Sequence, residues 1–107
     1  MTHLLRGRVY RARPAGFADD KFFVVVSNNI RNRNLESALV VRFTTSKKPP
    51  LPSIVQIPDH GVVPGGSVVC DDIYELFDDE VKADLGALSA PTMGAIGDGL
   101  KAALSLR

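Results

Sequence analysis

The apolar residues of this chain come in short runs that glycine, proline and asparagine interrupt, and this spacing limits the possible folds more than any other feature. Each run is long enough for a strand and shorter than an ordinary helix. The run FFVVVS at residues 22–27 is apolar on both faces, so we expect it to be central in a sheet. Further strands are expected at residues 7–13, 37–44, 53–57 and 67–71, the last continuing into a strand at 73–77.

The end of the chain has the pattern of one amphipathic helix. Ser89 is a suitable N-cap, and Pro91 is tolerated in the first helical turn. The apolar face at helical spacing comprises Met93, Ile96, Leu100, Ala103 and Leu104. Three glycines in this segment each cost about 1 kcal/mol relative to alanine, so packing must hold the helix in place. Ahead of it, the acidic residues 78–80 predict a short helical turn.

Several short strands followed by one helix predict a mainly β fold, a small, strongly bent antiparallel barrel with a C-terminal helix. The length of 107 residues fits one domain over residues 1–107. In such a barrel the strands are dry along their length, and their ends meet loops on the rim. Binding residues are therefore expected in those loops.

Charge and cysteine content exclude several classes of protein. A net charge of +1 excludes a polycation, so nucleic-acid binding would require local clusters of basic residues. One cysteine, Cys70, excludes an internal disulfide framework, and its apolar setting predicts a buried, unreactive thiol. We find no apolar run of signal-peptide length near the start and none near the roughly 20 residues that span a bilayer. A cytoplasmic protein is therefore expected.

The segment SNNIRNRN at residues 27–34 has two interpretations. Its arginines, Arg31 and Arg33, match phosphate oxygens, and Asn28 and Asn29 can hydrogen-bond to exposed bases of a single strand. Alternatively, the segment is a solvated loop or helical turn in which the asparagines satisfy local geometry.

Two other strand ends carry polar side chains. Thr44, Thr45 and Ser46, with Lys47 and Lys48, either bind a phosphate or form a polar turn that keeps an edge soluble. Asp71 follows an apolar run, so it is either a partly desolvated general base or a residue that simply ends a strand.

Other catalytic patterns receive little support. His3 and His60 lie near a terminus and in a Gly/Pro loop, where surface histidines are expected. The sequence has no ligand spacing typical of a metal site and no phosphate-binding or nucleophile-elbow motif. We therefore expect no metal and no cofactor.

Taken together, five segments resemble the MazF/PemK family of toxin endoribonucleases. They are RGRVYRA, FVVVSNN, VVRFTTS, SVVCDDI and LGALSAPTMGAIGDGLKAAL, which occur in the family's order from about residue 6 to residue 106. The resemblance implies an SH3-like barrel, a homodimer, and metal-independent, sequence-specific cleavage of single-stranded RNA in a bacterial cytoplasm. It also implies a cognate antitoxin whose C-terminal segment occupies the RNA groove.

The resemblance assigns roles to individual residues. The family's phosphate-contacting threonine falls on Thr44, and the acid after the SVV-type strand falls on Asp71. The arginine that usually precedes the second strand is Lys21 here, a cation without the planar fork. The arginine that one branch of the family carries two residues before the acid is Val69 in this chain.

A mechanism without a cofactor follows from these roles. The 2′-hydroxyl of the RNA attacks the adjacent phosphate and leaves a 2′,3′-cyclic phosphate and a 5′-hydroxyl. Asp71 is the candidate base, and Lys21 and Thr44 stabilise the developing charge. The predicted RNA-binding residues are Asn28, Asn29, Arg31, Arg33, Ser46, Lys47 and Lys48. The expected substrate is mRNA, with tRNA and rRNA as further candidates.

Two other functions suit the same fold. One is a topoisomerase-poisoning toxin of the CcdB type, which the set of Lys21, Thr44 and Asp71 disfavours. The other is a non-catalytic RNA-binding barrel. Incubation with long RNA separates both from an endoribonuclease.

Overall fold

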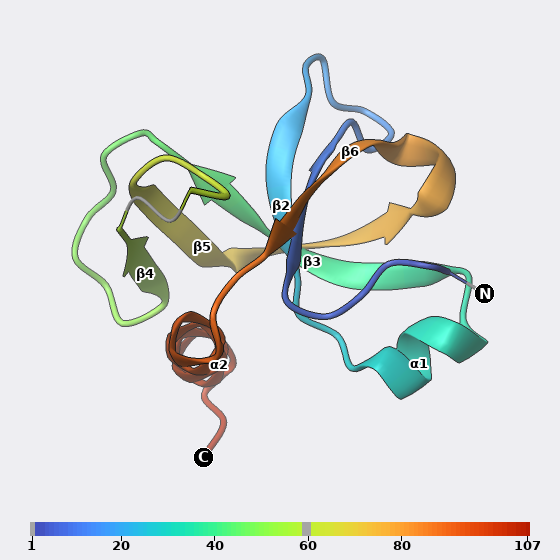
Figure 1. Cartoon of the computed structure of the whole chain (residues 1–107). Helices are drawn as coiled ribbons and strands as arrows, with labels where there is room; N and C mark the ends of the chain where they lie inside the picture. The colour runs from blue at the N-terminus through green and yellow to red at the C-terminus, as the bar shows by residue number, and fades with distance from the viewer. Residues whose placement is uncertain (1, 59–60) are drawn as a thin grey trace.

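The computed structural model describes residues 2–58 and 61–107. These residues form one six-stranded antiparallel sheet with a helix after its last strand (Figure 1). The strands are β1 (Arg8–Ala12), β2 (Lys21–Val25), β3 (Ser37–Thr44), β4 (Ile54–Ile57), β5 (Gly66–Phe77) and β6 (Val81–Ala87). Their order across the sheet is β4-β5-β3-β2-β1-β6, so β2 is a central strand, as predicted.

Three helical segments complete the structure: α1 (Asn29–Asn34), the 3-10 turn η1 (Asp78–Glu80) and α2 (Ala90–Leu104). The predicted turn at residues 78–80 and the terminal helix are confirmed. In Figure 1, α2 lies on the side of β4 and β5, and α1 lies beside β3.

The prediction was wrong or incomplete at two strands. Residues 67–71 and 73–77 form the single strand β5, and strand β6 was missed. The signal for β6 was present, because Val81, Ala83 and Leu85 alternate with charged residues at the period of a half-buried strand.

The predicted barrel is present as a strongly bent sheet that does not close. Strands β4 and β6 form its two edges, and no pairing joins them within residues 2–58 and 61–107. A mainly β fold with a C-terminal helix is confirmed.

An irregularity in the pairing of β3 with β5 accompanies the bend. Val41 pairs with Ile73, whereas the next residue, Arg42, pairs with Val69. Residues 70–72 therefore have no partner in β3, and such a bulge bends a strand and redirects its side chains.

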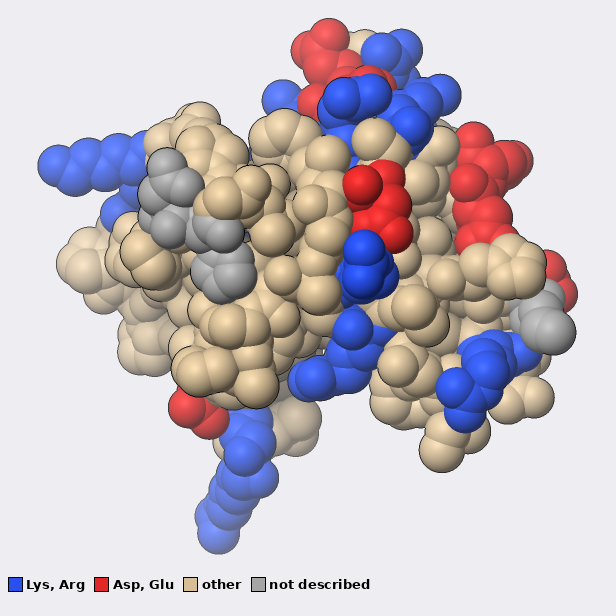
Figure 2. All heavy atoms as spheres, in the orientation of Figure 1, with Lys and Arg blue, Asp and Glu red and all other residues tan. Residues whose placement is uncertain are grey.

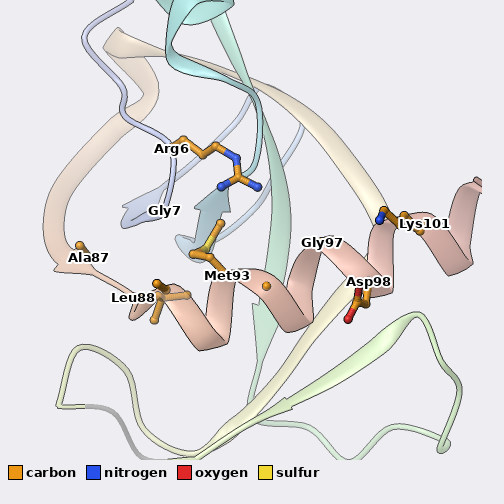
Figure 3. A pocket seen from close by; sticks show the side chains of 10 residues that line it. Arg6, Gly7, Ala87, Leu88, Met93, Gly97, Asp98 and Lys101 are labelled. Atoms are coloured by element: carbon orange, nitrogen blue, oxygen red, sulfur yellow. The ribbon is translucent and has the colours of Figure 1, made fainter. Parts of the chain in front are cut away.

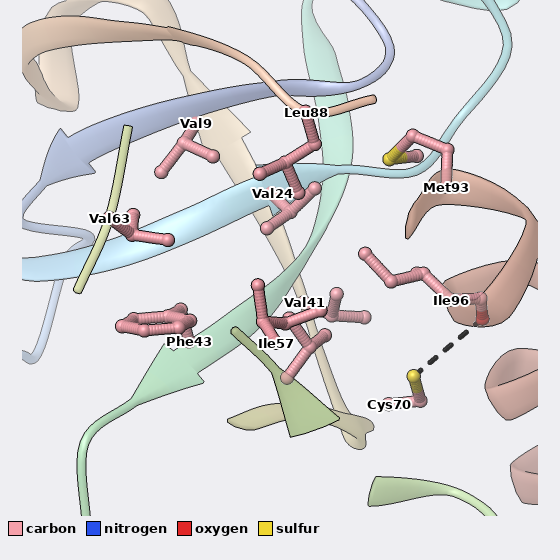
Figure 4. Close-up of a cluster of buried hydrophobic side chains, with 11 residues drawn as sticks. Val9, Val24, Val41, Phe43, Ile57, Val63, Cys70, Leu88, Met93 and Ile96 are labelled. Atoms are coloured by element: carbon pink, nitrogen blue, oxygen red, sulfur yellow. Dashed lines mark hydrogen bonds between the residues drawn. The ribbon is translucent and has the colours of Figure 1, made fainter. Parts of the chain in front are cut away.

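The buried side chains form two clusters, and β3 contributes to both. The first contains Val9, Val24, Val41, Phe43, Ile57, Val63, Val68, Cys70, Leu88, Met93 and Ile96 (Figure 4). The second contains Leu4, Tyr10, Ala12, Phe23, Val25, Ala38, Val40 and Leu76. Alternate residues of β3 thus face two separate cores.

Helix α2 packs on the first cluster through a close contact. Ser89 caps it, its side chain accepting a hydrogen bond from Thr92 N at 3.3 Å. A Cβ on Gly99 would lie 2.8 Å from both Cys70 Sγ and Val55 Cγ2, so a larger residue there would force these side chains to shift. Leu104 was predicted on the buried face, but it lies in the last turn and is 52% exposed.

Helix α1 depends on a buried amide. Asn32 is 1% exposed, its Oδ1 accepts a hydrogen bond from Ser27 Oγ at 2.6 Å, and its Nδ2 donates to Ser27 O at 3.0 Å. Asn28 caps the helix, because its Oδ1 accepts from Arg31 N at 2.8 Å. The segment after β2 is thus a fixed helical turn.

We expect Asn32→Ala to lower the free energy of unfolding by roughly 2–3 kcal/mol, because buried polar groups of Ser27 lose their partners. Asn34→Ala is the matched control: Asn34 is exposed on the same helix and should cost less than about 0.5 kcal/mol. Urea unfolding measures both, and equal losses would contradict the structural role of Asn32.

Cys70 is buried, as predicted, and its Sγ contacts Ile96 O at 3.7 Å (Figure 4). Burial, with a smaller contribution from the Asp71 carboxylate, raises the pKa of the Cys70 thiol to about 11. The folded state therefore favours the neutral thiol. This stabilisation is fully present below the pKa of the unfolded thiol and is lost as pH rises towards 11.

Between pH 8 and pH 10.5 we expect the wild type to lose about 2 kcal/mol more stability than Cys70→Ala, which has no thiol to titrate. Denaturant unfolding at the two pH values gives the difference. The same pH dependence in both proteins would show that the thiol does not carry this effect.

Candidate functional site

A pocket of about 270 Å³ lies where β2 begins and β3 ends. Phe22 pairs with Phe43 in the antiparallel ladder. Lys21, at the start of β2, and Thr44, at the end of β3, therefore lie at the same end of the two strands. The residues that line the pocket are Arg11, Asp20, Lys21, Phe22, Phe43, Thr44, Thr45 and Ser46. The structure therefore brings together two of the three predicted catalytic residues, along with Ser46.

The hydroxyl groups lie on the turn after β3. Thr44 Oγ1 accepts a hydrogen bond from Ser46 N at 3.1 Å, which fixes the side chain and leaves its hydroxyl hydrogen for another acceptor. Ser46 and Lys47 are exposed, and Lys48 is half-buried. This turn can present hydroxyl donors and positive charge to one anionic group.

Charged groups from β1 and the loop before β2 complete the pocket. Lys21 is exposed, and Arg11 lines the same pocket from the neighbouring strand β1. Asp20 lies between two arginines: its Oδ1 accepts from Arg13 Nε at 2.9 Å, and its Oδ2 lies 3.5 Å from Arg11 Nε. Sequence analysis missed Arg11 and Asp20, although Arg11 belongs to the basic run RGRVYRAR.

Asp71 does not line this pocket. It lies in the β5 bulge, where its Oδ2 accepts a hydrogen bond from Ser53 Oγ at 2.7 Å. The side chain is exposed, so the desolvation expected from its apolar neighbours is absent. Asp71 follows Ser67, the residue that pairs with Thr44, by four residues along β5.

The residues of α1 lie beyond the other end of β2. Asn29 Oδ1 accepts from Arg6 N at 2.8 Å, and Arg31 Nη1 donates to Ser37 O at 2.6 Å. With the capping role of Asn28, three of the predicted RNA-binding side chains make local structural contacts. Arg33 is exposed. On the face in Figure 2, Lys and Arg lie in several separate groups rather than in one basic patch.

A second, larger cavity of about 590 Å³ separates the N-terminal segment from α2 (Figure 3). It is lined by Arg6, Gly7, Ala87, Leu88, Ala90, Met93, Gly94, Gly97, Asp98 and Lys101. A Cβ on Gly94 or Gly97 would meet no atom within 4 Å. None of the predicted site residues lines this groove.

Other predicted features can also be located. His3 is exposed, and His60 lies outside the described residues. Within residues 2–58 and 61–107, no cluster of three or more His, Cys, Asp or Glu could hold a metal ion. The same residues contain no helix long and apolar enough to span a membrane.

Residues 6–104 match the family model described as PemK-like, MazF-like toxin of type II toxin–antitoxin system. Endoribonuclease MazF1 of Mycobacterium bovis is 35% identical over 99% of this chain and 97% of its own length. Endoribonuclease MazF4 of Mycobacterium tuberculosis is similar to the same extent.

Solved structures show the same fold. An endoribonuclease in complex with its cognate antitoxin, from a mycobacterial species, is 35% identical with a TM-score of 0.87, over 97% of both chains. The MazE–MazF complex of Deinococcus radiodurans is 19% identical with a TM-score of 0.79, over 97% of both chains, and supports the fold alone.

Proposed function

The chain belongs to the family of PemK-like, MazF-like toxins of type II toxin–antitoxin systems, and on this premise we propose that it is an endoribonuclease that cleaves single-stranded RNA. The main observation in support is the pocket where β2 begins and β3 ends, which is lined by a lysine, an arginine and three hydroxyl side chains. Such a set binds a phosphate and stabilises negative charge that develops on it.

In the proposed reaction the 2′-hydroxyl of the RNA attacks the adjacent phosphate, forming a 2′,3′-cyclic phosphate while the bond to the 5′-oxygen breaks. The leaving 5′-oxygen takes up a proton, for which Lys21 is the candidate donor. Lys21 and Thr44 hold the phosphate oxygens, and the Thr44 hydroxyl donates to the one that gains charge. Ser46 and Lys47 extend the contact along the strand, with Lys48 and Arg33 as more distant cations.

Asp71 is the proposed general base, and its position sets a condition on the mechanism. A base must come within hydrogen-bond reach of the 2′-hydroxyl in the bound complex. Because Asp71 lies outside the pocket in the single chain, it can act as the base only if RNA binding or dimer formation brings its carboxylate to the 2′-hydroxyl beside the phosphate that Lys21 and Thr44 hold. Asn28 and Asn29 keep their amide N–H groups as donors for bases, since their structural contacts use the oxygens.

The proposed partners are RNA, a cognate antitoxin and a second copy of the chain. The mycobacterial relative solved in complex with its cognate antitoxin supports the antitoxin as a partner. An acidic antitoxin segment would compete with RNA for the cations of the pocket and of the turn after β3. We propose the cytoplasm as the location, with mRNA as the main substrate and tRNA or rRNA as others.

The first test is cleavage of a long RNA by the purified protein. Because lysine, arginine and hydroxyl groups supply the charge stabilisation, cleavage should persist in EDTA. Products should carry cyclic phosphate and 5′-hydroxyl ends, and RNA with a 2′-deoxy nucleotide at the cut site should stay intact. Cleavage that requires magnesium or leaves a 5′-phosphate would refute the mechanism.

Thr44→Ala should lower kcat by about 10²–10³, the usual cost of losing one donor to a developing oxyanion. Thr44→Ser, which keeps the hydroxyl, should restore most of the activity. Steady-state cleavage of a short fluorescent RNA gives both values. An inactive serine variant that remains folded would assign Thr44 a packing role instead.

Asp71→Asn should lower kcat by about 10²–10⁴ if Asp71 removes the proton from the 2′-hydroxyl. Ser53→Ala is the control, because it removes the hydrogen bond to Asp71 and keeps the carboxylate. If kcat falls no further in Asp71→Asn than in Ser53→Ala, Asp71 does not take part in the chemical step.

A homodimer is expected, since so small a core gains stability by burying further apolar surface. The open face of α2 around Gly94 and Gly97 is available for such contact. Sedimentation at micromolar concentration should give twice the mass of the chain. A monomer at ordinary salt would contradict this expectation.

A further inference from the structure

Arg11 is the pocket residue that comes from β1. It lies in β1, where it pairs with Phe22 of β2 on one side and with Ala83 of β6 on the other. Its side chain lines the pocket that also contains Lys21 and Thr44. The backbone of Arg11 is therefore paired on both sides, whereas Lys47 and Lys48 lie on the turn after β3.

The contact of Arg11 with Asp20 leaves its hydrogen-bond donors available. The Nε–Oδ2 distance of 3.5 Å is longer than a charge-assisted hydrogen bond, which is about 2.7–2.9 Å. Asp20 makes its short contact with Arg13, at 2.9 Å. The Asp20 carboxylate therefore attracts the Arg11 guanidinium electrostatically but does not form a short hydrogen bond with it.

Lys21 alone cannot bind two phosphate oxygens in a fixed plane. A lysine ammonium is a compact point charge, whereas a guanidinium presents parallel donors that fit two oxygens of one phosphate. Within the set of pocket-lining residues, Arg11 is the one with this fork.

We infer that the Arg11 guanidinium donates two hydrogen bonds to the RNA phosphate that Lys21 and Thr44 also contact, and that Asp20 positions the Arg11 side chain. This inference rests on the proposed function for the identity of the substrate. It assigns Lys21 the role of a point charge and Arg11 the role of fixing the orientation of the phosphate.

Arg13 provides a matched control. It is 50% exposed, close to the 46% of Arg11, and it pairs with the same carboxylate. It does not line the pocket. If the arginines served only to hold the loop before β2, Arg13 would matter at least as much, because its contact with Asp20 is shorter.

The test compares Arg11→Gln with Arg13→Gln, each of which removes one positive charge. The probe is a mixed-sequence single-stranded DNA, which carries phosphates and lacks the 2′-hydroxyl, so binding is measured without cleavage. One lost phosphate contact should lower the slope of log affinity against log salt by about 0.7. Arg11→Gln should show this decrease, and Arg13→Gln should keep the wild-type slope.

Equal slopes in the two variants, or no binding by the wild type, would overturn the inference. Thermal unfolding of both variants checks the fold. Arg11→Lys is the second variant: it keeps the charge, so it should keep the slope but lose the fork.

Cleavage of long RNA separates the inference from the proposed function. Arg11→Gln and Arg11→Lys should each lower kcat/KM by roughly 10²-fold, and Arg13→Gln by less than about threefold. A wild type that cleaves RNA with both glutamine variants equally active refutes the role of Arg11 alone. A wild type that never cleaves refutes the endoribonuclease, while the salt slopes still decide whether Arg11 binds phosphate.

Discussion

The ladder between β3 and β5 is the constraint on which the rest of the structure depends. Alternate residues of β3 face two different cores, so this strand holds the two halves of the bent sheet together. The three residues of β5 without a partner in β3 accompany the bend and place Cys70 against α2. There the backbone of Gly99 approaches so closely that a Cβ would force Cys70 or Val55 to shift.

The candidate phosphate-binding pocket lies at the start of β2 and the end of β3. Because β2 and β3 are antiparallel, the start of one and the end of the other meet, and Lys21 and Thr44 share a pocket. The bulge that shapes the sheet also exposes Asp71, away from that pocket. Phosphate binding thus depends on the ends of β2 and β3, whereas the proposed proton transfer depends on bringing Asp71, in the middle of β5, to the same phosphate.

Polar side chains in this small domain serve both stability and recognition. Among the amides after β2, Asn32 is buried and Asn28 caps α1, while the amide N–H groups of Asn28 and Asn29 remain proposed donors for bases. The arginine–aspartate contacts around Asp20 likewise link the loop before β2 to the pocket edge. A short chain with a small core uses such contacts to fix the loops that carry its function.

Local sequence patterns predicted the mainly β fold, the central position of β2 and the capped terminal helix, whereas the roles of Lys21 and Thr44 followed from the family resemblance. The fold class, the place of β2 and the helix depend on local periodicity, caps and the order of strands, all of which neighbouring residues specify. Tertiary contacts set the open edges of the sheet, the place of Asp71 and the presence of Arg11 and Asp20 in the pocket. Those features depend on register and on contacts between distant segments, which the pattern of a single segment does not contain.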